Sequence, residues 1–125
     1  MEPVTVLVIE KGAEAALVCA ALAKKPEVRV LDAPDVGRAL KRLKAHPGQV
    51  AVAIVGTSGL AKSAELLKKL EPHGIPVVGV VHGLPPEARE RALAAGVREI
   101  HERPIRWQPY SELIDSVVSR FSVPN

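Results

Sequence analysis

The sequence predicts a single α/β domain, a five-stranded parallel sheet in the doubly wound, flavodoxin-like order 2-1-3-4-5. Five strand-like runs alternate with stretches of helical periodicity, which is typical of a parallel sheet covered by helices on both faces. The chain has 125 residues, of which 47% are hydrophobic and 25% charged. This size and composition suit one hydrophobic core, so we expect one domain over residues 1–125.

The expected strands are short runs rich in valine and isoleucine. They span residues 4–10, 28–32, 50–55, 76–81 and 97–102. The first, third and fourth are almost continuously apolar, as strands buried on both faces are, and so belong in the middle of the sheet. The second and fifth carry polar residues and belong at its edges, which gives the order 2-1-3-4-5.

Helical periodicity and end signals predict the segments between and after the strands. The expected helices span residues 13–25, 36–45, 61–70, 86–95 and 110–121. Asp35 precedes the second helix, where an N-cap is expected. Pro86 in the first turn and Gly96 just past the end bound the fourth helix. Such helices supply the crossover connections that a parallel sheet requires.

Composition argues against several classes of protein. The longest apolar run, residues 15–23, is much shorter than the roughly 20 residues of a membrane span. A single cysteine, Cys19, excludes an internal disulfide framework, and no secretory signal is visible, so a cytoplasmic location is expected. A net charge of only +3, with one Trp, one Tyr and one Phe, makes direct nucleic-acid binding an unfavoured function. The scarcity of Asn, Gln, Cys and Met suggests a thermophilic source.

Functional residues are expected at the carboxyl ends of the strands, where the strand order of a doubly wound sheet reverses. The residues that follow the first, third, fourth and fifth strands are Glu10, Lys11, Gly56-Thr57-Ser58-Gly59, His82, Gly83 and Arg103. A glycine-bounded loop that carries hydroxyls can bind an anion through its backbone amides, although an ordinary loop is the favoured interpretation. The candidate anion-binding residues are Lys11, Thr57, Ser58 and Arg103.

No nucleophile–base pair and no metal-ligand spacing stand out in the sequence, so we expect neither an enzyme nor a cofactor. The four histidines are scattered over different segments, and a surface or capping role is favoured for each. Trp107 leads into the last helix and has two interpretations. It packs that helix onto the sheet, which is favoured, or it is an exposed anchor for a partner.

Several segments resemble those of response-regulator receiver domains. Residues 8–11 (Val-Ile-Glu-Lys) stand where receivers have apolar residues followed by an acidic pair, and residues 33–40 resemble the exit from their second strand. Residues 75–78 (Ile-Pro-Val-Val) are similar to the start of their fourth strand, and residues 92–97 to their Ala-Leu-x-Ala-Gly-Ala run. Arg103-Pro104 stands where receivers have Lys-Pro, joined by a cis bond in that family. The resemblance implies a receiver fold and a place in two-component signalling, of the phosphorelay kind.

The same resemblance implies a phosphorylation site whose chemistry this sequence lacks. Receivers accept a phosphoryl group on an aspartate at the end of the third strand, and this position is Gly56, which has no nucleophile. The degenerate site positions are Glu10, Lys11, Gly56, Val81, Ile100 and Arg103. We therefore expect a pseudo-receiver that binds no Mg²⁺. The ammonium of Lys11 is expected over the crevice, close to Glu10 or Asp32, in place of the metal.

Partner contacts are the function that remains under this resemblance. Receivers commonly use the face made by the helix at 86–95, the strand at 97–102 and the last helix. The candidate partner residues are Arg89, Arg91, Arg98, Glu99, Glu102 and Arg106. We expect a non-catalytic signalling module that contacts protein partners, a second copy of itself among them. The alternative is a small-ligand module that binds an anion or nucleotide at the crevice of Lys11, the Gly56-Thr57-Ser58-Gly59 loop and Arg103.

Overall fold

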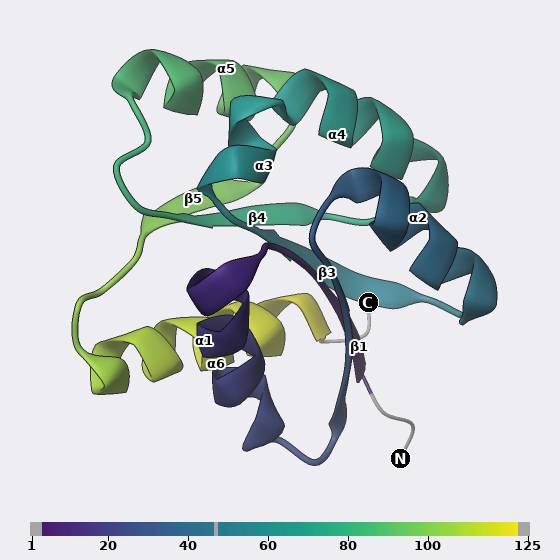
Figure 1. The fold of residues 1–125 in the computed structure, drawn as a ribbon, viewed down its shortest axis with the longest axis vertical. Helices are drawn as coiled ribbons and strands as arrows, with labels where there is room; N and C mark the ends of the chain where they lie inside the picture. Colours follow the sequence, from purple (N-terminus) through teal and green to yellow (C-terminus); the bar gives the residue numbers. More distant parts are fainter. Residues whose placement is uncertain (1–3, 47, 123–125) are drawn as a thin grey trace.

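The computed structural model, which describes residues 4–46 and 48–122, contains one parallel sheet with helices on both faces (Figure 1). Its strands are β1 (Val4–Ile9), β2 (Val28–Ala33), β3 (Val50–Val55), β4 (Val77–Val81) and β5 (Glu99–Glu102). They are ordered β2-β1-β3-β4-β5, and every neighbouring pair is parallel. The predicted fold class and strand order are confirmed.

The helices divide between the two faces of the sheet (Figure 1). Their bounds are α1 (Gly12–Ala23), α2 (Val36–Ala45), α3 (Thr57–Ala61), α4 (Ser63–Leu70), the 3₁₀ turn η1 (Glu71–His73), α5 (Pro86–Ala95) and α6 (Trp107–Ser122). α1 and α6 cover one face, and α2, α3, α4 and α5 cover the other. Within the described residues, no helix has the length and apolar character needed to cross a membrane.

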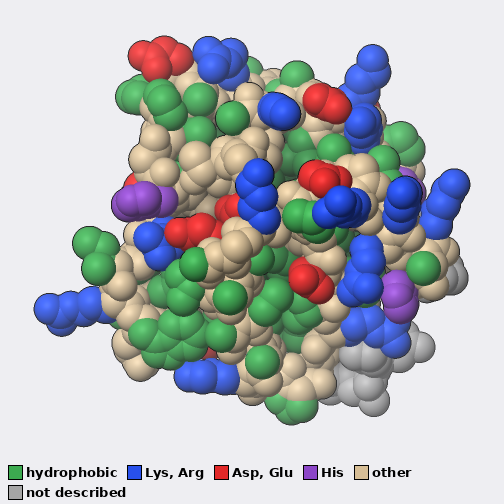
Figure 2. All heavy atoms as spheres, in the orientation of Figure 1, with side chains coloured by type: hydrophobic (Ala, Val, Ile, Leu, Met, Phe, Trp, Pro, Cys, Tyr) green, Lys and Arg blue, Asp and Glu red, His purple; other side chains and the backbone are tan. Residues whose placement is uncertain are grey.

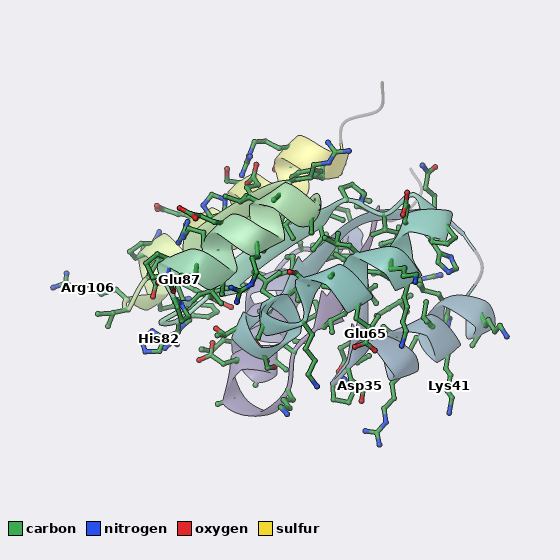
Figure 3. The ribbon with its side chains drawn as sticks, turned by 90° about the horizontal axis from the view of Figure 1, so that it is seen from above. Asp35, Lys41, Glu65, His82, Glu87 and Arg106 are labelled. Atoms are coloured by element: carbon green, nitrogen blue, oxygen red, sulfur yellow. The ribbon has the colours of Figure 1, made fainter. Side chains whose placement is uncertain are left out.

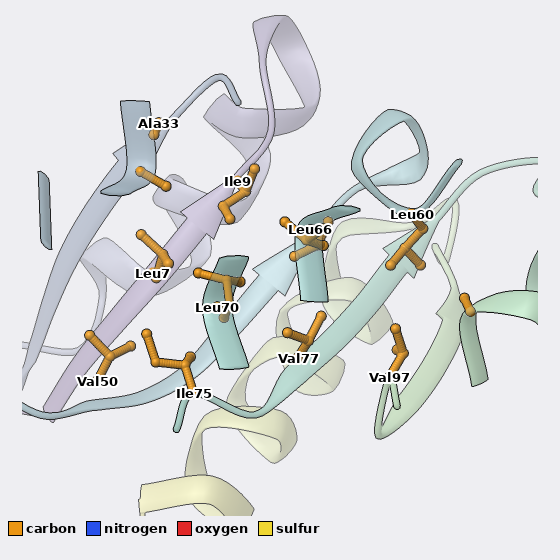
Figure 4. Close-up of a cluster of buried hydrophobic side chains, with 14 of the residues drawn as sticks. Leu7, Ile9, Ala33, Val50, Leu60, Leu66, Leu70, Ile75, Val77 and Val97 are labelled. Atoms are coloured by element: carbon orange, nitrogen blue, oxygen red, sulfur yellow. The ribbon is translucent and has the colours of Figure 1, made fainter. Parts of the chain in front are cut away.

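Alternation along the central strands builds two cores, one on each face of the sheet. Val6 and Val8 of β1 point into the core under α1 and α6, whereas Leu7 and Ile9 point into the core under α2 to α5. Figure 4 shows the second core, in which Leu66 of α4 lies over the sheet with other apolar side chains. All four β1 side chains are almost completely buried, as predicted for a strand in the middle of the sheet.

The segment from Thr57 to Ala61 differs from the prediction, because it is a short helix and not a loop. Leu60 is buried against the sheet with an exposed fraction of 1%. A Cβ built on Gly59 would overlap Val55, and one built on Gly79 would overlap Leu60, so both glycines let α3 approach the sheet closely. This packing outweighs the low helix propensity of glycine.

The predicted helix ends lie within two residues of the observed ones, except at the start of the last helix. The Asp35 carboxylate accepts the backbone N–H of Arg38 at 2.8 Å, which confirms the N-cap of α2. The last helix begins at Trp107, earlier than the sequence indicated. Among the peptide bonds described, none is cis, so the cis Arg103-Pro104 bond implied by the resemblance is not found. The trans form is the one that bonds to proline ordinarily favour.

Candidate functional site

The carboxyl ends of the strands bring the predicted site residues to one edge of the sheet. The backbone N–H of Gly56, just after β3, donates to the carbonyl of Ile9 at 3.2 Å, so Gly56 lies beside the end of β1. The N–H of Arg103, just after β5, donates to the carbonyl of Val81 at 2.7 Å. The residues that follow β1, β3, β4 and β5 are therefore neighbours, as the strand order predicts.

The Glu10 side chain covers Gly56. A Cβ built on Gly56 would overlap the Glu10 carboxylate, with Oε2 and Cδ as the nearest atoms. The backbone N–H of Lys11 donates to Glu10 Oε1 at 3.0 Å and helps to hold the carboxylate there. The backbone φ of Gly56 is −87°, which any residue can adopt. The backbone conformation at position 56 therefore suits any residue, but a side chain there would need the space that the Glu10 carboxylate occupies.

On the α1 and α6 side, a small internal cavity lies next to Glu10. Its volume is about 10 Å³, and Glu10, Glu14, Gly56 and Tyr110 are among the residues that line it. The Tyr110 ring is buried, and its hydroxyl has no hydrogen-bond partner among the described residues. Burial, with the nearby Glu14 charge as a second cause, raises the pKa of Tyr110 well above its usual value. Arg103 Nε lies 3.5 Å from Glu14 Oε2. The guanidinium of Arg103 therefore lies on this side of the site and offsets the negative charge of Glu14.

The Thr57 hydroxyl makes its hydrogen bonds within the protein. Thr57 Oγ1 accepts the backbone N–H of His82 at 2.9 Å and lies 3.4 Å from the His82 carbonyl, to which it donates. The contact joins the first residue of α3 to the end of β4. Thr57 therefore positions α3, whereas the His82 imidazole is mostly exposed, 3.8 Å from Glu102 Oε1.

On the opposite side, a cleft of about 340 Å³ opens between α2 and the pair α3 and α4. Its lining residues are Ile9, Lys11, Pro34, Asp35, Val36, Gly37, Ser58, Gly59, Lys62, Glu65, Leu66 and Lys69. Of the four candidate anion-binding residues, the structure brings Lys11 and Ser58 to this cleft but neither Thr57 nor Arg103. We refer to it below as the lysine cleft.

The expected ion pair of Lys11 with Glu10 or Asp32 is wrong. Among the described residues, no carboxylate lies within 4 Å of the Lys11 ammonium. Asp32 is instead 3.7 Å from Arg42 of α2, and Glu10 is turned over Gly56. Lys11 is exposed and lines the lysine cleft.

Comparison with solved structures gives nearly complete matches. The phosphorylated cyanobacterial phytochrome response regulator RcpA matches with a TM-score of 0.80 and 15% identity, over 98% of this chain and 97% of that one. The Mn²⁺-bound response regulator Rcp1 matches with a TM-score of 0.76 and 14% identity, over 98% of both chains. A response regulator from Thermotoga maritima matches with a TM-score of 0.74 and 19% identity, over 95% and 99%.

The chain has the receiver fold. These similarities are structural, because the identities are all below 20%. No family model matches the sequence, and no curated protein matches it either. The predicted resemblance to receivers is thus confirmed for the fold.

Two of the positions that the sequence resemblance predicts to be degenerate lie within the cores of this receiver fold. Val81 at the end of β4 is 1% exposed, and Ile100 in β5 is 9% exposed. Both belong to the core under α2 to α5 and offer no polar group to the site. In the described part of the chain, no three His, Cys, Asp or Glu side chains are grouped so that they could hold a metal ion.

The candidate partner residues differ in the hydrogen bonds and ion pairs that their side chains make within the protein. Arg89 donates to the Ile100 carbonyl at 3.2 Å, and Glu102 accepts the N–H of Gly83 at 3.0 Å. Glu99 binds Arg120 through both carboxylate oxygens and lies 2.6 Å from His101 Nε2. Hydrogen bonding by Arg120 lowers the pKa of Glu99 to about 2.

The remaining candidates are exposed arginines. Arg91 and Arg98 lie on the surface at α5 and before β5, and Arg106 extends away from the protein (Figure 3). The side chains of these three arginines take part in no hydrogen bond or ion pair found among the described residues. The Glu99 carboxylate, in contrast, is bonded to Arg120 and His101 within the protein.

Sequence reasoning missed Ile105, Lys62 and Lys69. Ile105 precedes α6 and is 96% exposed, a feature that its place between the last strand and the last helix could have indicated. Trp107 is 37% exposed, with its ring centroid 5.9 Å from that of Tyr110 and Lys24 Nζ 5.0 Å away. The Trp107 ring thus contacts Tyr110 of its own helix and Lys24, and part of its surface stays open. The aromatic residue of this segment that packs into the core under α6 is Tyr110. Lys62 and Lys69 line the lysine cleft.

Proposed function

We propose that this chain is a non-catalytic signalling module of the two-component receiver type, which acts through protein contacts and takes up no phosphoryl group. One observation carries the proposal: the Glu10 carboxylate fills the space over Gly56, directly after β3. The residue after β3 offers no side chain as an acceptor, and a longer side chain there would collide with Glu10. The site is built around a glycine.

Side-chain chemistry at the same edge supports this proposal. A divalent cation that assists phosphoryl transfer needs several oxygen ligands. Of the two carboxylates nearest the end of β1, Glu14 is neutralised by Arg103 at 3.5 Å, and Glu10 lies over Gly56. The residue that follows Glu10 is a lysine, which offers no oxygen ligand, and its side chain lines the lysine cleft on the other side. This edge of the sheet therefore offers neither a side chain that could accept a phosphoryl group nor enough oxygen ligands for the cation.

The surface at α5, β5 and the start of α6 is the proposed partner surface. We define it by Arg91, Arg98, Ile105 and Arg106. A protein interface combines apolar anchors with a polar rim, and arginine is enriched in such interfaces. Ile105 supplies an apolar side chain that is 96% exposed next to Arg106, and Arg91 of α5 and Arg98 just before β5 add positive charge farther along the same elements. A partner with an apolar recess and acidic groups near it would fit this surface.

The alternative function from the sequence was a small-ligand module at a single crevice. Its residues do not converge, because Arg103 pairs with Glu14 on the α1 and α6 side while Lys11 lines the lysine cleft on the other. Thr57 is bonded to the backbone of His82. This arrangement favours the protein-contact function, and the lysine cleft is a separate matter.

Two sets of variants test the proposed function in the protein as purified. Arg91→Glu with Arg98→Glu reverses charge on the partner surface, and Thr57→Ala with Ser58→Ala changes the end of β3. Self-association is measured by sedimentation velocity, and partner capture from an extract of the native cells is quantified by mass spectrometry. We expect the arginine pair to lose tenfold or more of the capture or self-association that wild type shows. Losses confined to the Thr57 and Ser58 pair would overturn the proposal.

A further inference from the structure

The lysine cleft is a second site on the molecule, distinct from the edge around Glu10 and Gly56. We propose that it binds a small phosphorylated molecule of the nucleoside monophosphate class. Its volume of about 340 Å³ falls in the range of small-molecule sites, roughly 300–1,000 Å³. Figure 3 shows Asp35 and Glu65 at this gap between α2 and α4, whereas Lys41 points away from it.

The charges of the cleft leave two lysines for an anion. Glu65 is 3.0 Å from Lys69, and this pairing lowers the pKa of the Glu65 carboxyl, so the two charges offset each other. Asp35 accepts the N–H of Arg38, and its other oxygen lies 3.9 Å from Arg38 Nε. Among the described residues, Lys11 and Lys62 have no carboxylate within 4 Å. Two unpaired ammonium groups match the two negative charges of a monophosphate near neutral pH.

The carboxylates of Asp35 and Glu65 narrow the class of ligand. Their negative charges repel a ligand that carries several negative charges, so a monophosphate suits the cleft better than a triphosphate. Their free oxygens can also accept hydrogen bonds from hydroxyl or amino groups, which a nucleoside carries. The Ser58 hydroxyl adds a donor on the α3 side.

Apolar side chains complete the lining and give room for a ring. Ile9 and Leu66 are buried at 3% and 2% exposure, and Val36 is partly buried beside them. Small-molecule sites combine apolar surface with a few polar groups that orient the ligand. Inorganic phosphate would use only the lysines, whereas a nucleoside monophosphate uses both parts of the lining.

Gly37 keeps this cleft open although the fold does not require glycine there. A Cβ built on Gly37 would meet only Asp35 Oδ1, at an ordinary 3.4 Å, and its φ is not in the left-handed region. A glycine within a helix lowers stability relative to alanine. Gly37 lines the cleft from the first turn of α2, so the missing side chain leaves space for a ligand.

Amide NMR spectra of the whole protein test the proposal directly. AMP, GMP, CMP and UMP are each titrated to 5 mM (on the order of a weak metabolite affinity), beside ATP, adenosine and inorganic phosphate. We expect the amide signals of Gly37 and Gly59 to shift and saturate with at least one monophosphate, and adenosine and phosphate to bind at least tenfold more weakly. ATP is expected to bind more weakly than the monophosphate.

Matched charge reversals separate the cleft from general surface attraction. Lys11→Glu with Lys62→Glu changes the cleft, and Lys41→Glu with Lys68→Glu changes exposed lysines of α2 and α4 by the same total charge. The first pair should weaken binding tenfold or more, and the second pair less than threefold. Gly37→Leu, which fills the cleft and keeps every lysine, should also weaken binding. Equal losses in both lysine pairs, or no saturable shift with any monophosphate, would overturn the proposal, and the spectra themselves show that each variant is folded.

Discussion

The carboxylate of Glu10 occupies the volume that the Cβ of any other residue at position 56 would need. Glu10 follows β1 and Gly56 follows β3, and the pairing of these strands holds the two residues side by side. The residue types at the two positions therefore depend on each other.

This dependence predicts the stability of Gly56→Ala in two backgrounds. In the wild-type protein the new methyl group must displace the Glu10 carboxylate from its hydrogen bond with the Lys11 N–H, at a cost of about 0.5–1.5 kcal/mol. In a Glu10→Ala background the methyl group has space, and the cost should fall below about 0.5 kcal/mol. Urea unfolding of the four proteins measures the difference.

Gly37→Ala is the matched control for that experiment. Its methyl group meets only Asp35 Oδ1 at an ordinary distance in the first turn of α2. We expect it to stabilise the protein by about 0.5–1 kcal/mol, since alanine has the higher helix propensity. An equal cost for Gly56→Ala with and without Glu10 would show that the two residues do not compete for space.

Removal of the Thr57 hydroxyl and removal of the Tyr110 hydroxyl should have opposite effects on the free energy of unfolding. Thr57→Val loses the acceptor of the His82 N–H and should destabilise the protein by about 1–2 kcal/mol, whereas Thr57→Ser keeps the bond. Tyr110→Phe removes a buried hydroxyl that has no partner in residues 4–46 and 48–122, and should be neutral or stabilise by up to about 1 kcal/mol. Thermal unfolding compares the three variants. A large loss in Tyr110→Phe would reveal a hydrogen bond that this arrangement of residues does not contain.

The Glu99 carboxylate predicts a pH dependence of stability. Hydrogen bonding by Arg120, helped by His101, holds its pKa at about 2 against a usual value of 4.5. Because the pKa is lowered by folding, the contribution is complete above pH 4.5 and is lost as the pH falls towards 2. The free energy of unfolding should exceed that of Glu99→Gln by about 1 kcal/mol at pH 7. Urea unfolding from pH 7 to pH 3 should show this difference shrinking.

Glu87→Gln provides the comparison for the acid series, because Glu87 is an exposed carboxylate on α5. Its difference from wild type should stay within about 0.5 kcal/mol at every pH. A difference between wild type and Glu99→Gln that stays constant down to pH 3 would mean that the Glu99 carboxyl is not held at a low pKa.

Ile105 should matter for partners and not for folding. Its side chain is 96% exposed, so Ile105→Ser should change the free energy of unfolding by less than about 0.5 kcal/mol. Partner capture or self-association should fall with it, as in the arginine pair. Ile100→Ser is the opposite case, since Ile100 is buried in the core, and it should destabilise by several kcal/mol, about 2–4. Unchanged capture with Ile105→Ser would remove Ile105 from the proposed partner surface.

The sheet could be predicted from sequence because its signals are local and redundant. Continuous apolar runs mark β1, β3 and β4 as central strands, and polar residues mark β2 and β5 as edges. The end signals of α2 and α5 were equally direct, through Asp35 and Gly96. The edge at which Glu10, Gly56 and Arg103 meet then followed from the strand order.

The parts that sequence missed depend on contacts between distant segments. α3 forms because Leu60 finds space over Gly79, and no local pattern shows this. The partner of Lys11 could not be deduced, because Arg42 holds Asp32 and the choice depends on side-chain directions. The lysine cleft likewise joins residues from three separate stretches of chain, 9–11, 34–37 and 58–69. Figure 2 shows Lys and Arg side chains gathered over α2 and α4, the helices that border it.

The absence of phosphorylation is the central claim, and intact-mass measurement after treatment with acetyl phosphate and Mg²⁺ tests it most directly. A receiver domain of known activity, treated in parallel, shows that the donor works. Wild-type protein should keep its unmodified mass, because Gly56 carries no acceptor and Glu10 covers it. A stoichiometric phosphoryl adduct that survives acid and is released by base, as an acyl phosphate is, would contradict the account.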